Sequence, residues 1–537
     1  MNRDKAIQTL KAGETFDVLV IGGGATGSGV ALDAASRGLK VALVEKNDFA
    51  EGTSSRSTKM VHGGVRYLEK AVKRLDREQY SLVKEGLHER GIFLKNAPHL
   101  AIPLSFVTPL YRWIDVPQVF AGLKLYDLLS GKMNIGKSQF LSKKEVQERY
   151  PMVNDKNLKA GVLYYDGQFN DARMGVYILK TAVEQGAVVA NHLAVTELLK
   201  EGKKVKGAVV QDEFTGEQFE IRAECVVNAT GPFADSIRKL DVKESKEILK
   251  VSSGVHIMLD KRFSPPENGL MIPKTDDGRV LFVIPWEGHT IIGTTDEPAE
   301  ISEHPKALEE EIEYVLGYAN KYFNLGVTRE DVKSYWSGLR PLVFDPEKEN
   351  TQELARTHVI KYNGTGMVTV TGGKWTSYRR MAEDVMDVVV SENDFSHAGE
   401  CITRTLPIVG GANFESDGYI ELMEKFDLDE DVARHLNHFY GDRAYKVATL
   451  AKEGYEKRLH PEYPYLEAEI IYSVREEMGI HAADVLIRRL PLGLIDINAT
   501  GVVSHRVIEL MDSELSWSHE EKAREKEILM NRLNEAI

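Results

Sequence analysis

The chain has 537 residues, 42% of them hydrophobic and 28% charged, a composition typical of a soluble globular protein with two or three domains. Its 82 acidic residues outnumber the 68 basic ones, and the resulting net charge of -14 argues against binding to nucleic acid. The two cysteines, Cys225 and Cys401, cannot build a disulfide framework or a multi-cysteine zinc site, so we expect free thiols in a reducing cytoplasm.

The beginning of the chain carries no targeting signal that we recognise. Residues 1–5 lack the apolar core of a secretory signal, and no later segment has the roughly 20 apolar residues that span a bilayer. We therefore expect a protein that is cytoplasmic or peripheral to a membrane. The cysteine and histidine spacings match no zinc ligand set, so no metal centre is predicted.

The first predicted elements are a strand and a helix joined by a glycine-rich turn. Residues 16–21 (FDVLVI) suit a buried parallel strand, which leads into a Gly-x-Gly-x-x-Gly motif formed by Gly22, Gly24, Ala25, Thr26 and Gly27. The first glycine permits a tight turn, the second lets the backbone approach a pyrophosphate, and the third allows close packing of the helix on the strand. The helix is predicted over residues 28–37.

A second strand over residues 39–44 ends at Glu45, which lies 18 positions after Gly27. An acidic residue about 20 positions after the motif bonds the ribose hydroxyls of an unphosphorylated dinucleotide. This unit therefore predicts FAD or NAD and disfavours NADP, but it does not decide between the first two.

A segment rich in hydroxyl groups and glycine follows at residues 52–69 (GTSSRSTKMVHGGVRYLE). Its side chains can donate hydrogen bonds to phosphate and ribitol oxygens, and its glycines let backbone lie against a flat ring. We expect cofactor contacts from Thr53, Ser54, Ser55, Ser57, Lys59, His62, Gly63 and Gly64.

This segment resembles the signature of the FAD-dependent glycerol-3-phosphate dehydrogenases, in which a serine-rich stretch leads into His-Gly-Gly-x-Arg-Tyr-Leu. The resemblance extends over about residues 16 to 385 and continues, more faintly, around residues 469–489. Its other blocks are 171–173 (DAR), 227–232 (VNATGP), 254–256 (GVH), 291–296 (IIGTTD), 337–342 (SGLRPL) and 372–376 (GGKWT).

The resemblance implies an α/β fold with a discontinuous, Rossmann-like FAD domain of the glycine-oxidase and amino-acid-oxidase type. We expect its pieces at about 1–80, 150–240 and 340–395, and an antiparallel substrate domain at about 81–149 and 240–340. Residues 400–537 are predicted to form a helical cap domain, because apolar residues recur with helical spacing over 466–478 and 519–533.

The reaction that the resemblance implies is oxidation of sn-glycerol 3-phosphate to dihydroxyacetone phosphate, with hydride transfer to noncovalently bound FAD. The cofactor would also contact Thr230, Gly231, Gly373, Lys374, Trp375 and Thr376. We expect His256, Arg340 and Lys374 to be catalytic, with His256 as the base unless Arg340 or a water organises proton removal. The predicted substrate contacts are Arg66, Tyr67, His256, Arg340, Arg356 and Lys374.

Several alternatives stay open. An oxygen-reducing glycerol-3-phosphate oxidase would act on the substrate in the same way, while an amine or amino-acid oxidase and a non-catalytic flavoprotein binding module are weaker rivals. The resemblance implies a membrane quinone as electron acceptor, at the inner face of the cell membrane. Residues 111–144 mix apolar and basic side chains and could either contact a membrane or pack on the core. The sequence does not decide whether the protein forms a homodimer.

Overall fold

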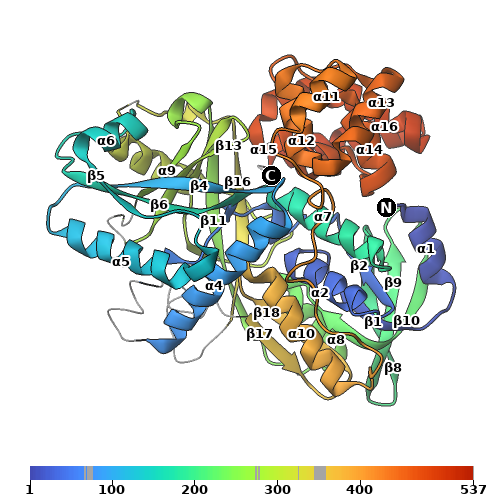
Figure 1. Ribbon diagram of the computed structural model, residues 1–537. Helices are drawn as coiled ribbons and strands as arrows, with labels where there is room; N and C mark the ends of the chain where they lie inside the picture. Colours follow the sequence, from blue (N-terminus) through green and yellow to red (C-terminus); the bar gives the residue numbers. More distant parts are fainter. Residues whose placement is uncertain are drawn as a thin grey trace.

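The computed structural model describes residues 1–65, 68, 76–272, 275, 278–324, 326–343 and 358–535 (Figure 1). Two β-sheets lie side by side with helices on their outer faces, and the C-terminal helices, orange to red in Figure 1, gather in a separate body above the first sheet. The predicted α/β fold with a C-terminal helical domain is confirmed.

The first sheet is built around β1, whose apolar residues are buried in the core. Strand β1 pairs in parallel with β10 on one side and with β2 on the other. The sheet order β17-β18-β10-β1-β2-β7 is extended by the hairpin β8-β9, which pairs with β10. The strands are β1 (Phe16–Ile21), β2 (Val41–Val44), β7 (Val188–Ala190), β8 (Leu193–Glu201), β9 (Lys204–Asp212), β10 (Gln218–Asn228), β17 (His358–Tyr362) and β18 (Met367–Gly372).

Helices cover this first sheet and complete its core. Helix α2 follows the glycine turn and packs against α7 and α10. A side chain at Gly27 would stand 1.9 Å from the Gly22 carbonyl oxygen, so only glycine allows α2 to approach the strand this closely. The helices of this layer are α1 (Arg3–Lys11), α2 (Ala25–Ser36), α7 (Asp171–Glu184), α8 (Ala234–Asp241) and α10 (Tyr378–Glu392).

The second sheet is antiparallel except for the parallel pair β12-β4. It contains β3 (Met60–Val61), β4 (Ala101–Leu110), β5 (Gln139–Ser142), β6 (Ala160–Phe169), β11 (Leu249–Leu259), β12 (Asn268–Ile272), β13 (Leu281–Trp286), β14 (His289–Gly293), β15 (Glu297–Ala299) and β16 (Ser334–Val343). Strand β6 belongs to this sheet, although we expected residues from about 150 onward in the FAD domain. The difference arises because β6 pairs along its full length with β4.

The helices beside the second sheet are α4 (Arg77–Asn96), α5 (Asp115–Ser130), α6 (Lys143–Arg149) and α9 (Glu309–Tyr322). Short 3-10 turns join elements of both sheets: η1 (Thr53–Ser55), η2 (Gly131–Met133), η3 (Gly231–Phe233), η4 (Lys261–Phe263), η5 (Arg329–Asp331) and η7 (Trp375–Ser377). None of the helices that the structure describes combines the length and apolar character needed to cross a bilayer.

The C-terminal domain is helical, as its sequence periodicity predicts. Its helices are α11 (Tyr419–Phe426), α12 (Glu430–Tyr440), α13 (Ala444–Leu450), α14 (Glu467–Glu477), α15 (Leu492–Ile495), α16 (Ile497–Leu515) and α17 (His519–Asn534), with the 3-10 turn η8 (Gly441–Arg443) and the short π-helices η9 (Ala451–Tyr455) and η10 (Asp484–Arg489). Both cysteines are free thiols, as expected: Cys225 lies in β10, and Cys401 lies between α10 and α11.

Buried ion pairs join this domain to the first sheet and its helices. Arg173 on α7 is fully buried and donates through both terminal nitrogens to the carboxylate of Glu477 on α14. Asp48, in the loop after β2, is also fully buried and accepts from Arg488 and Arg489 of η10. Because an unpaired buried charge is strongly destabilising, these pairs fix how the two domains are joined.

Candidate active site

A cavity of about 490 Å³ lies at the carboxyl ends of β1 and β2, where parallel sheets of this type bind their ligands. The residues that line it come from separate parts of the chain. Those that the sequence singled out are Gly22, Gly24, Ala25, Thr26, Glu45, Thr53, Ser54, Thr230, Gly231, Gly373, Lys374 and Trp375.

The start of helix α2 faces this cavity. The cap residue Gly24 has no side chain to satisfy the free amide groups, and one of them, that of Ala25, donates to Ser54 Oγ at 2.8 Å. A helix N-terminus carries a partial positive charge and unpaired N–H groups, which suit a phosphate. The first turn of α2 can therefore hold a pyrophosphate.

Glu45 lies in the cavity wall at the tip of β2. Its carboxylate accepts hydrogen bonds from the backbone N–H of Gly23 at 2.6 Å and from that of Asn47 at 2.9 Å. Glu45 thus fixes the glycine turn, and its oxygens keep further lone pairs that can accept from ribose hydroxyls.

The hydroxyl-rich loop divides into two groups. Thr53 and Ser54 line the cavity and are held in place, because Thr53 Oγ1 donates to the carbonyl of Leu339 at 2.6 Å and Trp375 Nε1 donates to the carbonyl of Ser54 at 2.8 Å. The loop therefore contacts β16 and η7, both of which are far from the loop in the sequence.

The second group makes hydrogen bonds inside the protein. Ser55 Oγ donates to the carbonyl of Glu51 at 3.2 Å, and Ser57 Oγ donates to Asp171 Oδ2 at 2.7 Å. Lys59 Nζ forms an ion pair with Asp171 Oδ1 at 2.6 Å, and both side chains are fully buried. Ser57 and Lys59 hold the loop on α7, while Ser55 bonds within the loop, so direct contact between these side chains and a cofactor stays a proposal.

The segment from His62 to Gly64 has its own support. The His62 N–H donates to Thr376 Oγ1 at 3.1 Å, and the Gly63 N–H donates to the Tyr126 hydroxyl at 2.8 Å. The Tyr126 hydroxyl in turn donates to Asp166 at 2.9 Å, and burial together with Asp166 raises the pKa of Tyr126 well above its usual value. This buried network keeps the glycine backbone in one position.

His256 on β11 is buried against Trp336 on β16. Its Nε2 lies 2.9 Å from Thr58 Oγ1, while Nδ1 has no hydrogen-bond partner among the described residues. Burial first, then the nearby Arg340 and Lys59, lower the pKa of His256 well below its usual value. His256 is therefore a neutral imidazole, and only a group that enters this buried position could bond to Nδ1.

Arg340 lies on the same face of the β11-β16 ladder as His256, because Arg340 pairs with Ser252 and Trp336 pairs with His256. Its guanidinium donates to the carbonyl of Ser253 at 2.8 Å and to Thr294 Oγ1 at 2.9 Å. The guanidinium passes over Gly254, where a side chain would stand 2.1 Å from Nη2. Gly254 thus makes room for Arg340 to approach His256.

Arg66, Tyr67 and Arg356, predicted to contact substrate, lie outside the described residues. Lys374 lines the cavity next to Gly373 and Trp375. The structure therefore brings together two of the predicted catalytic groups, His256 and Arg340, on one sheet, and the third, Lys374, on the wall of the neighbouring cavity.

The sequence did not single out some residues that hold this site. Thr58 contacts His256, Trp336 stacks on His256, and the Tyr126–Asp166 pair supports Gly63. Asp171 belongs to the sequence block at residues 171–173, but its pairing with Lys59 is visible only in the structure. Each acts on a partner far away in the chain, so no local spacing reveals it.

The arrangement fits FAD. It offers a glycine turn and helix N-terminus for a pyrophosphate, a carboxylate for a ribose, and the hydroxyl groups of Thr53 and Ser54 for a ribitol chain. Bound there, FAD would contact the turn at Gly22–Gly24 and the loop at Thr53 and Ser54.

Comparisons with known proteins agree with this interpretation. Residues 17–379 match the family model described as FAD dependent oxidoreductase, and residues 401–522 match that of the C-terminal domain of alpha-glycerophosphate oxidase. The chain is 47% identical to a probable mitochondrial glycerol-3-phosphate dehydrogenase of Caenorhabditis elegans and 45% identical to the human mitochondrial glycerol-3-phosphate dehydrogenase. Each match covers 98% of this chain and 74% of the relative.

Solved structures give the same picture. A glycerol-3-phosphate dehydrogenase from Bacillus halodurans complexed with FAD matches with a TM-score of 0.81 and 33% identity, covering 99% of this chain and 97% of that one. A glycine oxidase from Geobacillus kaustophilus matches with a TM-score of 0.53 and 19% identity, over 71% of this chain and 95% of that one, which shows a shared fold.

Proposed function

The chain belongs to the family of FAD-dependent glycerol-3-phosphate dehydrogenases, and we propose that it oxidises sn-glycerol 3-phosphate to dihydroxyacetone phosphate. The observation that supports this most directly is that a neutral His256 and the Arg340 guanidinium lie on one face of β11 and β16, beside a cavity suited to FAD.

The flavin, when bound, supplies the acceptor for the hydride that leaves the alcohol carbon. His256 receives the hydroxyl proton at Nδ1, in the tautomer whose Nε2–H donates to Thr58 Oγ1. The stack on Trp336 holds the ring in this orientation. The neutral ring can accept a proton without first losing one, although burial, which lowers its pKa, makes it a weaker base than an exposed histidine.

Cationic side chains hold the dianionic phosphate of the substrate. Arg340 is fixed by Ser253 within β11 and by Thr294 directly after β14, so its guanidinium is already oriented before substrate arrives. Lys374 supplies a second positive charge from the cavity wall. Arg66, Tyr67 and Arg356 complete the substrate contacts that we propose.

The test is anaerobic mixing of the purified, yellow protein with sn-glycerol 3-phosphate. We expect the flavin absorbance to bleach, whereas glycerol and glycine, which lack the phosphate, leave it unchanged. A flavin that stays oxidised with the phosphorylated alcohol would contradict the proposal, and bleaching by glycine would favour an amino-acid oxidase instead. Yellow colour remaining in acid-precipitated protein would contradict noncovalent binding.

We further propose that electrons pass to a membrane quinone at the inner face of the cell membrane. Support comes from helix α5, whose exposed face carries apolar residues at helical spacing: Ile114, Pro117, Ala121 and Leu128. Ile114 and Leu128 are 78% and 74% exposed, and Trp113 beside them is 61% exposed. Exposed Lys132 and Lys137 follow, and can meet anionic lipid headgroups.

The match of residues 401–522 to a glycerophosphate oxidase domain favours oxygen as a second candidate acceptor. Reoxidation of the reduced flavin separates the two. Fast reoxidation by a short-chain quinone with little hydrogen peroxide supports the dehydrogenase, and stoichiometric peroxide in air supports the oxidase. Sedimentation with anionic vesicles, reduced by Ile114→Asp and Leu128→Asp together, tests the membrane surface.

A further inference from the structure

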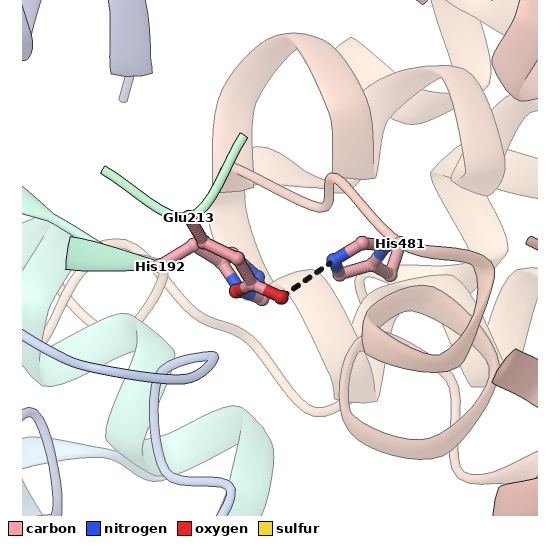
Figure 2. A group of neighbouring side chains, drawn as sticks. All are labelled: His192, Glu213 and His481. Carbon is pink, nitrogen blue, oxygen red and sulfur yellow. Dashed lines mark hydrogen bonds and ion pairs between the residues drawn. The ribbon is translucent and has the colours of Figure 1, made fainter. Parts of the chain in front are cut away.

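Two histidines and a glutamate meet where the first sheet contacts the C-terminal domain (Figure 2). His192 lies in the turn before β8, Glu213 in the turn after β9, and His481 just before η10. His192 Nδ1 is 2.8 Å from Glu213 Oε2, and His481 Nε2 is 3.9 Å from Glu213 Oε1. Glu213 thus stands between nitrogens of two different domains.

The other nitrogen of each histidine contacts a buried carboxylate. His192 Nε2 lies 3.2 Å from Asp484 Oδ2, and His481 Nδ1 lies 2.7 Å from Glu525 Oε1. Metal-binding histidines almost always have such a partner, which fixes the tautomer and the direction of the ring. Here it leaves His192 Nδ1 and His481 Nε2 directed at the same space, on either side of Glu213.

The distances suit a small tetrahedral site. The two imidazole rings are nearly perpendicular, at 85°, with centroids 4.8 Å apart, so their nitrogens can converge without contact between the rings. Zinc binds nitrogen and oxygen at about 2.0–2.1 Å, which puts neighbouring tetrahedral ligands roughly 3.4 Å apart. The candidate ligand atoms lie within 4.8 Å of one another, so small side-chain movements would bring them to that spacing.

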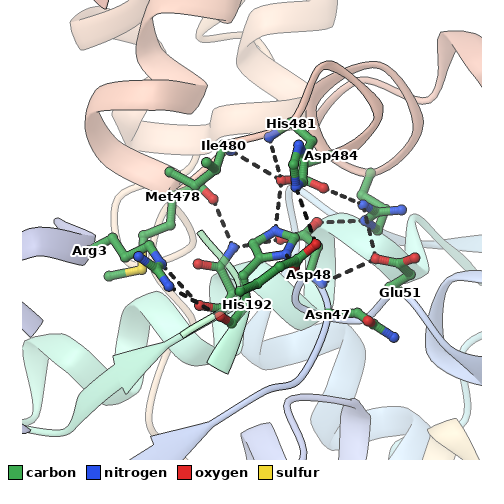
Figure 3. Close-up of polar contacts among 12 residues, drawn as sticks. Arg3, Asn47, Asp48, Glu51, His192, Met478, Ile480, His481 and Asp484 are labelled. Atoms are coloured by element: carbon green, nitrogen blue, oxygen red, sulfur yellow. Dashed lines mark hydrogen bonds and ion pairs between the residues drawn. The ribbon is translucent and has the colours of Figure 1, made fainter. Parts of the chain in front are cut away.

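The partners around the cluster are themselves fixed (Figure 3). Asp484 accepts from the backbone N–H groups of Ile480 and His481 and from Arg488 Nη2. Glu525 also accepts from the Ala482 N–H at 3.0 Å. Rings and carboxylates held in this way need little reordering when an ion binds.

The cluster has an apolar cover and an open side. The Phe214 ring packs against both histidines, with centroids 5.3 Å from that of His192 and 5.2 Å from that of His481. The Glu213 side chain is 43% exposed, so an ion can enter from solvent along it. A fourth position on that side suits a water molecule.

A neighbouring group, Asp48, His192 and Asp484, is a poorer candidate. Asp48 already accepts from Arg488, Arg489 and Asn191, and Asp484 accepts from Arg488. These guanidinium groups neutralise both carboxylates and would repel a cation. The ion therefore belongs on the Glu213 side of His192.

We propose that His192 Nδ1, His481 Nε2 and a carboxylate oxygen of Glu213 bind one zinc-like divalent transition metal ion per chain, with water as the fourth ligand. Two imidazoles and one carboxylate suit zinc and its neighbours among the transition metals, whereas calcium and magnesium prefer oxygen ligands alone. Because the ligands come from both domains, the ion links the C-terminal domain to the first sheet. No local motif marks this site, because the ligands lie far apart in the chain.

The site also backs onto the FAD cavity. The His192 N–H donates to the carbonyl of Asn47, and the Leu193 N–H donates to the carbonyl of Glu45. Asn47, Leu193 and Glu45 all line that cavity. A bound ion would thus steady one wall of the cofactor site without touching the reacting groups.

The experiment uses the full-length holoprotein, stripped with a chelator, dialysed, and titrated with Zn²⁺ alone or Co²⁺ alone. We expect one equivalent of either ion to bind, Co²⁺ to give the strong visible absorption of a tetrahedral site, and the melting temperature to rise. Weak binding of several ions, or a Co²⁺ spectrum of an octahedral site, would overturn the proposal.

The main variant is Glu213→Gln, which changes a half-exposed side chain and should leave the fold intact, as shown by unchanged flavin content. We expect at least about a tenfold loss of affinity and loss of the tetrahedral spectrum, and a similar loss for His481→Gln. Glu525→Gln, which alters only the positioning partner, should weaken binding by about 10–100-fold.

The matched control is His505→Gln. His505 on α16 is an exposed histidine beside Glu509 in the same domain, with His505 and Glu509 side chains 78% and 50% exposed. We expect this variant to bind like the unchanged protein. Equal affinity of the unchanged protein and Glu213→Gln would refute the site, as would loss of binding in His505→Gln alone. Because these readouts do not use turnover, they are independent of the proposed dehydrogenase activity.

Discussion

The imidazole of His256 stacks on the indole of Trp336, with ring centroids 5.3 Å apart and planes inclined by 14°. Both side chains are buried, at 2% and 0% exposure. The stack and the contact with Thr58 leave the ring little freedom to turn. Because the ring cannot turn, its Nδ1 faces a single position. A general base needs such a fixed orientation toward the proton that it removes.

The first prediction concerns this base. His256→Gln should slow flavin reduction by sn-glycerol 3-phosphate by about 10²–10⁴-fold, the usual contribution of a positioned general base, while flavin content stays unchanged. Stopped-flow absorbance measures the rate. The control is His397→Gln at an exposed histidine, whose side chain is 55% exposed. A His256→Gln enzyme with its full reductive rate would exclude His256 as the base.

A second prediction concerns Arg340. Arg340→Lys removes the guanidinium fork and should raise the substrate concentration for half-maximal flavin reduction at least tenfold, which corresponds to about 1.4 kcal/mol. Gly254→Ala should act similarly, because its Cβ would displace the guanidinium. The matched change is Gly317→Ala on α9, where a Cβ meets nothing within 4 Å. If Gly254→Ala leaves substrate affinity unchanged, Arg340 does not hold the substrate from this position.

The buried pair of Lys59 and Asp171 gives a third prediction. Asp171→Asn leaves the Lys59 ammonium buried without its counter-ion and should lower the free energy of unfolding by about 3–5 kcal/mol. FAD affinity should fall too, because Ser57 loses the same partner. Urea titration and flavin fluorescence measure the two effects. Glu148→Gln, in the exposed pair with Lys144, should change neither; equal behaviour of the two variants would show that burial of the pair does not matter.

The fourth prediction concerns acid stability. Burial first, then His438 and Arg173, lower the pKa of His99 to about 3. The unfolded chain, with an ordinary histidine pKa of about 6.5, therefore binds more protons between these values, so stability falls as the pH drops through this window. His99 alone should remove about 2 kcal/mol between pH 7.5 and pH 5.

His99→Gln removes that titration, so its urea midpoint should depend less on pH than that of the unchanged protein. The exposed His505 serves as the control, since His505→Gln should leave the pH dependence as it was. An identical acid dependence in the His99→Gln protein would mean that His99 is protonated in the folded state as readily as in the unfolded one.

The parts of this protein that could be predicted are those set by neighbouring residues. The strand at residues 16–21, the turn from Gly22 to Gly27 and the carboxylate of Glu45 follow one another in the chain, so their spacing carries the information. The C-terminal helices were equally accessible, because helical periodicity is local.

What the sequence did not reveal depends on contacts between distant residues. Lys59 and Asp171 are 112 positions apart, so a lysine in a cofactor loop could not be recognised as the buried partner of an aspartate on α7. Likewise, β6 lies in the second sheet because of its pairing with β4, which residue type alone does not specify. The two histidines of the proposed metal site, His192 and His481, also lie in different domains and far apart in the chain, so local sequence does not reveal that they meet.

Arg173 and Asp48 bear on how such a chain could change over evolutionary time. Among the described residues, Arg173 pairs with Glu477 on α14, and Asp48 pairs with Arg488 and Arg489 in η10. A lineage could acquire those helices by small steps, but deleting them in one step would strand a cation and an anion in an apolar interior. Acquisition of the helical extension is therefore far easier to achieve than its removal.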